Sequence, residues 1–203
     1  MAGMNPPSSR TPTALERLAS SWVYGGFLAG FVLLLLLPVF TAGLSPAFLF
    51  VVLQLPIYML HQYEEHDGDR FRRFVNRSVG GGREVLSTRA VFVINIGGVW
   101  LVNVVSIWLA ATAGIGFGLI GVYATLVNAL VHLGPALATR RYNPGLATAI
   151  VLFLPLGGAG AWMVTASGQA GLPYHVLGLG VALALHAAIV GYVLGKRRRL
   201  ARS

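Results

Sequence analysis

Residues 46–66 read PAFLFVVLQLPIYMLHQYEEH, an apolar run that ends in a cluster of histidines and carboxylates. Four of the six acidic residues in the chain, and two of its five histidines, fall between positions 61 and 69. Ionisable groups at membrane depth are costly, and they normally face a protein interior or a water-filled cavity. The stretch therefore predicts a membrane-spanning helix with a functional site near its end.

The composition agrees with a membrane location. Hydrophobic residues make up 56% of the chain, charged residues only 10%, and the mean hydropathy is +0.72. These values are far from those of an ordinary soluble domain and indicate an integral membrane protein. Cysteine is absent, which excludes disulfides and thiolate ligands.

Six apolar stretches each approach the ~20 residues that a spanning helix requires. They are Trp22–Phe40, Pro46–Tyr63, Arg89–Ala111, Ile115–Ala138, Leu146–Ala166 and Pro173–Gly195. The sequence thus predicts an all-α, polytopic bundle of six transmembrane helices. We expect a flexible cytoplasmic tail over 1–19, one membrane domain over 20–195 and a basic cytoplasmic tail over 196–203.

Positive charge is confined to alternate connections. The 15 Lys and Arg residues lie before the first span, between spans two and three, between spans four and five, and after the last span. The other three connections carry none, so six crossings place every positive charge on one side. The positive-inside rule makes that side cytoplasmic, with both termini inside a bacterial cytoplasmic membrane. We expect the net charge of +9 to face the anionic inner leaflet and not nucleic acid, because these arginines are juxtamembrane.

The end of the second span presents polar groups to one side. At about 100° per residue, His61, Glu64 and Glu65 occupy roughly a third of the helix circumference, and Tyr58 continues the stripe. His66 is expected to point elsewhere. The polar connection after it, 67–88, is either a flexible cover for the site or a solvated link.

Other spans carry polar residues at a similar depth. In span four, Asn128 and His132 are four residues apart, and His132 precedes Arg140 by eight residues, or ~12 Å of helix. Asn95 in span three and His186 in span six also lie near the charged ends. Helices of alternating direction therefore bring these groups into one slab near the cytoplasmic face.

Imidazoles and carboxylates that converge in an apolar surrounding fit a metal site. Neutral histidine and carboxylate together suit iron, zinc or manganese, and paired carboxylates allow one or two divalent ions. The predicted metal ligands are His61, Glu64, Glu65, His132 and His186, with Glu64 and Glu65 also as catalytic groups. The predicted substrate-binding residues are Asn95, Asn128, Tyr58 and Arg141. A lone intramembrane histidine such as His186 is equally consistent with a structural hydrogen bond.

The motif His61-Gln62-Tyr63-Glu64-Glu65 has the pattern His-x-x-Glu-Glu, and the chain resembles the HXXEE family of small bacterial integral membrane proteins. Asn128, His132 and the later Tyr-Asn-Pro-Gly at 142–145 are similar to that family's arrangement. The resemblance implies a polyhelical fold with a His/Glu site and implies no particular reaction. The Tyr-Asn-Pro-Gly segment itself indicates a turn between two helices.

Three classes of function fit these features. The first is a metalloenzyme that acts on a lipid-like or prenyl-type substrate, by hydrolysis or by oxidation, with the arginine-rich loop holding an anionic headgroup. The second is a metal-independent isomerase or cyclase in which a buried glutamate is the general acid. The third is a transporter or a structural membrane protein. The sequence leaves the metal, the substrate, the reaction and the oligomeric state open.

Overall fold

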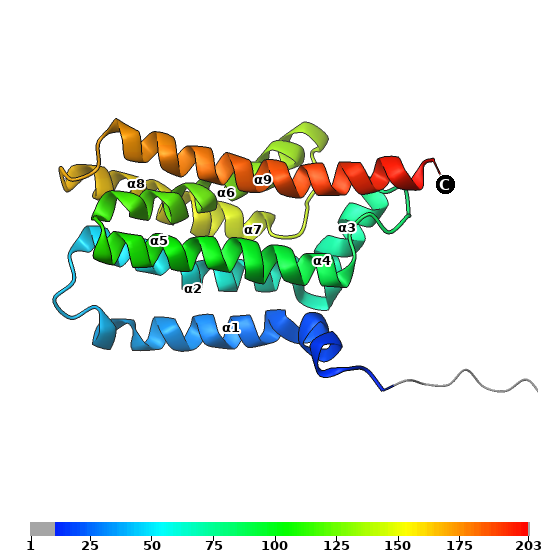
Figure 1. The fold of residues 1–203 in the computed structure, drawn as a ribbon, viewed down its shortest axis with the longest axis horizontal. Helices are drawn as coiled ribbons and strands as arrows, with labels where there is room; N and C mark the ends of the chain where they lie inside the picture. Colours follow the sequence, from blue (N-terminus) through cyan, green and yellow to red (C-terminus); the bar gives the residue numbers. More distant parts are fainter. Residues whose placement is uncertain (1–10, 203) are drawn as a thin grey trace, which may run out of the picture.

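The computed structural model describes residues 11–202, and within that range the chain is helical with no strand (Figure 1). Six long helical segments follow one another. They are α1 (Ala14–Phe40), α2 (Pro46–His66), α4–η2–α5 (Thr88–Phe92, Val93–Trp100, Leu101–Thr112), η3–α6 (Ile115–Gly118, Leu119–Thr139), α7–η4–α8 (Leu146–Thr148, Ala149–Phe153, Leu154–Ala166) and α9 (Leu172–Leu200). A short turn η1 (Asp67–Asp69) and helix α3 (Arg70–Ser78) connect α2 to α4. The predicted all-α class is confirmed.

Five of the six long segments are long and apolar enough to cross a membrane. They are Ala14–Phe40, Thr88–Thr112, Ile115–Thr139, Leu146–Ala166 and Leu172–Leu200. These helices indicate a membrane protein. The segment outside this group is α2, because polar side chains at Gln54 and in its last turns dilute its apolar run.

Helix α2 tolerates those polar residues because it lies inside the bundle. It contacts α1, α5, α6 and α8, and ten of its 21 residues are buried, against three of 29 in α9. Gln54, His61 and Gln62 are each at most 1% exposed. The long helix whose apolar run is interrupted by polar residues is therefore one that neighbouring helices cover.

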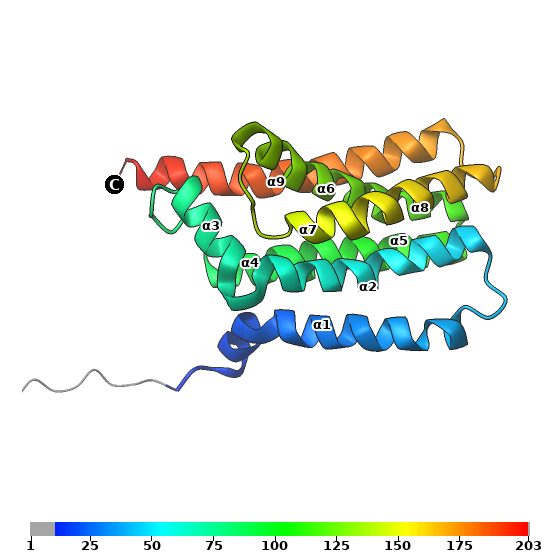
Figure 2. The ribbon, with the colours of Figure 1, turned by 180° about the vertical axis from the view of Figure 1, so that it is seen from behind.

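Both described chain ends lie at the same end of the bundle (Figures 1 and 2). The start of α1, the end of α2, helix α3 and the end of α9 gather there, so that Arg17, the arginines of α3 and those of α9 share one end. This arrangement is the one that alternate charged connections predict. The assignment of this end to the cytoplasm stays a prediction from charge.

The terminal segments differ from the predicted tails. Residues 1–10 lie outside the described range, but α1 begins at Ala14 and not after residue 19. A capping box starts it: Glu16 N–H donates to Thr13 Oγ1 at 3.2 Å, and Thr13 N–H donates to the Glu16 carboxylate at 2.7 Å. At the other end α9 continues through Leu200, so most of the expected basic tail is helix.

The connection 67–88 is folded, so it is not the flexible cover that the sequence allowed. Asn76 of α3 accepts hydrogen bonds from the N–H groups of Val85 and Leu86 and donates to the Leu86 carbonyl. Val85 and Leu86 are buried as a result. Arg72 binds Asp69 at 2.6 Å and Glu84 at 2.8 Å, which fixes α3 to the segments on either side of it.

The contact between α6 and α9 is close enough to require glycine at position 178. A Cβ added there would lie 2.7 Å from the backbone oxygen of Leu119, whereas one added at Gly180 would meet nothing within 4 Å. We expect Gly178→Ala to lower the free energy of unfolding by about 1–3 kcal/mol, because backbone atoms cannot move aside as a side chain can. Unfolding in mixed detergent micelles, with Gly180→Ala as the matched control, measures this. Equal stability of the two variants would contradict the packing described.

Candidate metal site

His61, Glu65 and His132 form a buried cluster between α2 and α6. One ligand atom from each residue lies within 4.8 Å of the others. Glu65 Oε2 is 3.7 Å from His61 Nε2, and Glu65 Oε1 is 3.7 Å from His132 Nε2. His61 and Glu65 share a face of α2 because they are four residues apart. All three side chains are buried.

The orientation of His61 is set by a threonine and a glutamate. His61 Nδ1 lies 2.8 Å from Thr148 Oγ1, and that hydroxyl donates its proton to Glu64 Oε2. The hydroxyl oxygen can therefore only accept from His61, which places the imidazole proton on Nδ1. His61 Nε2 then carries a lone pair, is buried and makes no hydrogen bond with a described residue.

The orientation of His132 is set in the same way by an asparagine. Asn143 Nδ2 donates to the backbone oxygen of His132 at 2.9 Å, which fixes the amide so that Oδ1 faces the ring. Asn143 Oδ1 lies 2.8 Å from His132 Nδ1, so Nδ1 carries the proton and Nε2 carries the lone pair. Such outer hydrogen bonds fix the tautomer and the ring direction of metal-binding histidines.

The distances in the cluster suit a cation better than direct hydrogen bonds. At 3.7 Å neither Nε2 is within hydrogen-bond distance of the carboxylate. Two nitrogen lone pairs facing one carboxylate repel it unless a positive charge lies among them. Ligand atoms bound at 2.0–2.1 Å in a tetrahedron are about 3.3 Å apart. The ligand atoms here are farther apart, at 3.7 Å for the two Glu65 pairs and within 4.8 Å for all three, so ion binding would draw them together. Two histidines and one glutamate are a known zinc set that keeps a fourth position open.

Glu64 does not face this cluster, although the sequence placed it among the metal ligands. Its carboxylate accepts from the Tyr142 hydroxyl at 2.7 Å, from the N–H groups of Ala147 and Thr148 at 3.1 and 2.7 Å, and from the Thr148 hydroxyl. It thus caps the helix that begins at Leu146, where free N–H groups and the helix dipole favour an anion. Successive helical residues point about 100° apart, so adjacent glutamates reach different neighbours.

Tyr142 remains a hydrogen-bond donor throughout the neutral range. Partial burial and the hydrogen bond to Glu64 raise the pKa of Tyr142 to about 12. The phenol therefore keeps the proton that it donates to Glu64.

His66 also differs from its prediction, because it does not point away from the site. Its Nε2 lies 3.2 Å from Glu65 Oε2. The ring lies 5.2 Å from that of Trp22 and 5.5 Å from that of Phe71 (centroid distances). At the last residue of α2 the chain leaves the helical path, with φ −112° and ψ −8°, so helical spacing no longer gives the direction of this side chain.

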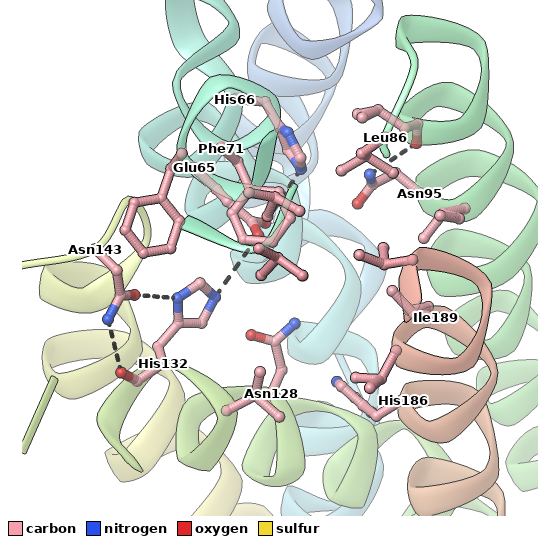
Figure 3. A pocket seen from close by; sticks show the side chains of 18 of the residues that line it. Glu65, His66, Phe71, Leu86, Asn95, Asn128, His132, Asn143, His186 and Ile189 are labelled. Atoms are coloured by element: carbon pink, nitrogen blue, oxygen red, sulfur yellow. Dashed lines mark hydrogen bonds and ion pairs between the residues drawn. The ribbon is translucent and has the colours of Figure 1, made fainter. Parts of the chain in front are cut away.

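An apolar cavity of about 330 Å³ adjoins the cluster between α3, η2, α6 and α9 (Figure 3). Glu65, His66, His132 and Asn143 contribute to one part of its wall, and Ile189 and His186 lie across from them in Figure 3. Most of the remaining lining is aliphatic or aromatic. Among the lining residues Val131, Val190 and Leu194 are 45, 51 and 39% exposed, so the cavity opens on the side of the bundle between α6 and α9.

The predicted substrate-binding residues divide into three groups. Asn95 and Asn128 line the cavity. Tyr58 is fully buried behind it and accepts a hydrogen bond from Asn128 Nδ2, which leaves Asn128 Oδ1 without a partner among the described residues. Arg141 is exposed and is not part of the cavity wall.

His186 lines the cavity but is not part of the three-residue cluster. Its Nδ1 lies 2.8 Å from the backbone oxygen of Ala182, one turn earlier in α9. The structure thus brings together three of the five predicted ligands, His61, Glu65 and His132, and places Glu64 and His186 elsewhere.

Sequence reasoning missed four residues that support the site. Thr148 and Asn143 orient the two histidines, and Gln62 donates to Asn95 Oδ1 at 2.7 Å while accepting from the Trp100 indole. A Cβ on Gly145 would lie 2.7 Å from His132 Cε1 and 2.9 Å from His61 Cε1. For Asn143 and Gly145 the only signal was the Tyr-Asn-Pro-Gly segment, which the sequence indicated simply as a turn. That turn packs directly on both imidazoles.

Comparison with known proteins finds one family. The family described as "Protein of unknown function with HXXEE motif" matches residues 52–159. This range holds the whole cluster and the residues that orient it, whereas α1 and α9 lie outside it. No curated protein and no solved structure matches the chain.

The Thr148 hydroxyl should govern metal affinity although it is not a ligand. We expect Thr148→Val to lower the affinity for a divalent ion by about 10–100-fold, because the His61 ring loses the acceptor that fixes its tautomer. Titration with zinc in detergent measures this. The control is Thr139→Val, which removes a hydroxyl bonded only to a carbonyl in its own helix. Equal affinities in the two variants would argue against the assigned role of Thr148.

Metal binding should also depend on the absence of a side chain at Gly145. Its φ of +97° lies in the region that favours glycine, and its missing side chain leaves room for both rings. We expect Gly145→Ala to displace His61 and His132 and to abolish stoichiometric metal binding. Gly134→Ala, at a position with no atom within 4 Å of the added Cβ, is the control. The metal content of both variants is measured after equilibrium dialysis. Full occupancy in Gly145→Ala would contradict the close approach of Gly145 to the two imidazole rings.

Proposed function

The chain belongs to the HXXEE family, and we propose that it is a membrane-embedded, metal-dependent enzyme that acts on a hydrophobic substrate. The observation that carries the proposal is the pair of imidazoles whose Nδ1 protons are held by Thr148 and Asn143, with both Nε2 atoms turned to the Glu65 carboxylate. A purely structural polar cluster needs no such alignment of two lone pairs.

The geometry supports one ion. His61, Glu65 and His132 supply three ligands, while the carboxylate of Glu64, which would be needed to bridge to a second ion, is held by four hydrogen bonds at the start of α7. His61 is fully buried, but Glu65 and His132 reach the cavity wall. An ion held by these three residues would therefore border the cavity.

A bound divalent ion would supply Lewis acidity or an activated water at the cavity wall. Zinc in a His₂Glu set suits hydrolysis, whereas iron in a set of two histidines and one carboxylate suits oxidation. The protein's own part is to orient both imidazoles, to keep bulk water away and to place an apolar substrate against the cluster. The lateral opening between α6 and α9 suits a substrate that arrives from the bilayer.

The metal-independent alternative has less support from the site. An isomerase or cyclase would need Glu65 to present a proton to the substrate. Both of its oxygens instead face imidazoles, Oε1 toward His132 and Oε2 toward His61 and His66. For transport, the polar groups at the opposite end of the bundle would have to take part, and there His175 is held between Tyr123 and Thr165, at 2.9 and 3.1 Å.

Metal content tests the proposal directly. Protein purified without a histidine tag and dialysed against zinc, iron(II) or manganese(II) is analysed by mass spectrometry. We expect about one ion per chain in the wild type and none above background in His61→Ala, Glu65→Ala, since that variant keeps one of the three ligands. His175→Ala, which removes a histidine outside the cluster, should keep full occupancy. Folded wild-type protein without metal would overturn the proposal.

A further inference from the structure

A second depression, here called the basic groove, lies beside the apolar cavity at the charged end of the bundle. Its lining residues are Arg70, Arg73, Phe74, Arg77, Ser78, Tyr142 and Pro144. Three of them are arginines of α3, and none is acidic. Arginine spacing of three and four residues places these guanidinium groups on one face of that helix.

Two of the three guanidinium groups have no anionic partner among the described residues. Arg70 is paired with Asp67 at 3.4 Å. Arg73 donates to a neutral acceptor, the backbone oxygen of Gly68, at 2.6 Å. Arg77 makes no hydrogen bond or ion pair within the range that the structure describes. The groove thus offers positive charge that the protein does not neutralise. By contrast Arg72, which points away from the groove, is bound by two carboxylates.

The groove and the apolar cavity share Phe74. This residue lines both, and it is 36% exposed. Phe71 and Val75 of α3, and Val79 directly after the helix, also line the cavity and form an apolar face beside Phe74. Helix α3 is therefore a partition with arginines on one side and hydrocarbon-lined space on the other. A single molecule with an anionic head and an apolar chain fits both spaces at once.

The groove also reaches the family motif. Tyr142 of the groove donates to Glu64, and Glu65, the next residue, faces the cluster. A head held by Arg73 and Arg77 would thus lie on one side of the motif while the chain passes the cluster on the other.

We propose that the ligand of this site is an anionic single-chain amphiphile with a phosphate-type headgroup. The headgroup binds Arg73 and Arg77 in the basic groove, and the hydrocarbon chain passes Phe74 into the apolar cavity. Guanidinium groups bind phosphate oxygens through paired, charge-assisted hydrogen bonds, which favours phosphate over an uncharged head. The inference rests on the proposed function, because it identifies the substrate class of that same cavity.

Photo-crosslinking tests this ligand class. The protein is placed in phosphatidylcholine nanodiscs with an alkyl phosphate that carries a diazirine in its chain, and labelled peptides are mapped by mass spectrometry. We expect labels on the cavity-lining parts of α3 and α9. Unlabelled dodecyl phosphate should compete at a concentration about tenfold or more lower than dodecanol or inorganic phosphate. Only dodecyl phosphate has both a headgroup for the basic groove and a chain for the apolar cavity. Dodecanol competing equally would overturn the role of the arginines, and phosphate competing equally would overturn the role of the cavity.

Two variants and a control locate the ligand. Arg73→Gln, Arg77→Gln should weaken competition by dodecyl phosphate about tenfold or more. Arg198→Gln, Arg199→Gln changes the net charge equally at the end of α9 and should leave it unchanged. Val190→Trp fills the cavity from an exposed position and should abolish labelling there. Equal loss of competition in both double variants would reduce the effect to general charge attraction and overturn the proposal.

The same assay separates this inference from the proposed function. His61→Ala removes a metal ligand that does not line the cavity and none of the groove arginines, so alkyl phosphate labelling should persist in it. Labelling without stoichiometric metal in the wild type would overturn only the enzyme proposal. Metal binding without saturable labelling would overturn only the amphiphile proposal.

Discussion

The carboxylate of Glu65 is buried inside a bundle of mostly apolar helices, and this constraint governs the structure around it. A buried carboxylate is costly unless it is paired or coordinates a cation. His61, His66 and His132 turn toward its two oxygens, so a cation bound among them would meet that requirement. Each partner needs support in turn, from Thr148 for His61 and from Asn143 for His132. The polar network thus extends outward from one side chain until it reaches backbone groups and the start of α7.

The position of α2 follows from the same requirement. A helix that carries Gln54, His61, Gln62 and Glu65 cannot face lipid with those groups, because the bilayer core offers no hydrogen-bond partners. Neighbouring helices cover it, and their own outward faces supply the apolar surface that a bilayer requires. Asn95 lies in the π-helical segment η2, and η4 directly follows Thr148. Wide helical turns of this kind are frequent at functional sites.

The apolar runs were sufficient to predict the six long helices. The restriction of arginines to alternate connections was sufficient to predict that positive charge lies at one end of the bundle. Helix α3 was missed, because a short arginine-rich segment has the composition of a loop. Its apolar residues, such as Val75, are stabilised by packing against other segments, including Val91 and Val193. Depth along the spans predicted one level for Asn95, Asn128, His132 and His186, and in the structure these residues line one cavity. It could not show which neighbour Glu64 faces, since both glutamates lie within one third of the helix. Thr148 and Asn143 act through individual side-chain hydrogen bonds to the histidines and to Glu64, which leave no periodic pattern in a sequence.

The two adjacent glutamates of the motif have a mechanical consequence. Glu64 holds the start of α7 while Glu65 holds the imidazoles, and both project from the same turn of α2. A small rotation of α2 about its axis would disturb both attachments together, so the geometry of the cluster and the docking of α7–η4–α8 against α2 depend on each other. A change that stabilises one of these two attachments should therefore also stabilise the other. The double glutamate thus connects the buried cluster to the turn at 142–145 and the helix start that follows it.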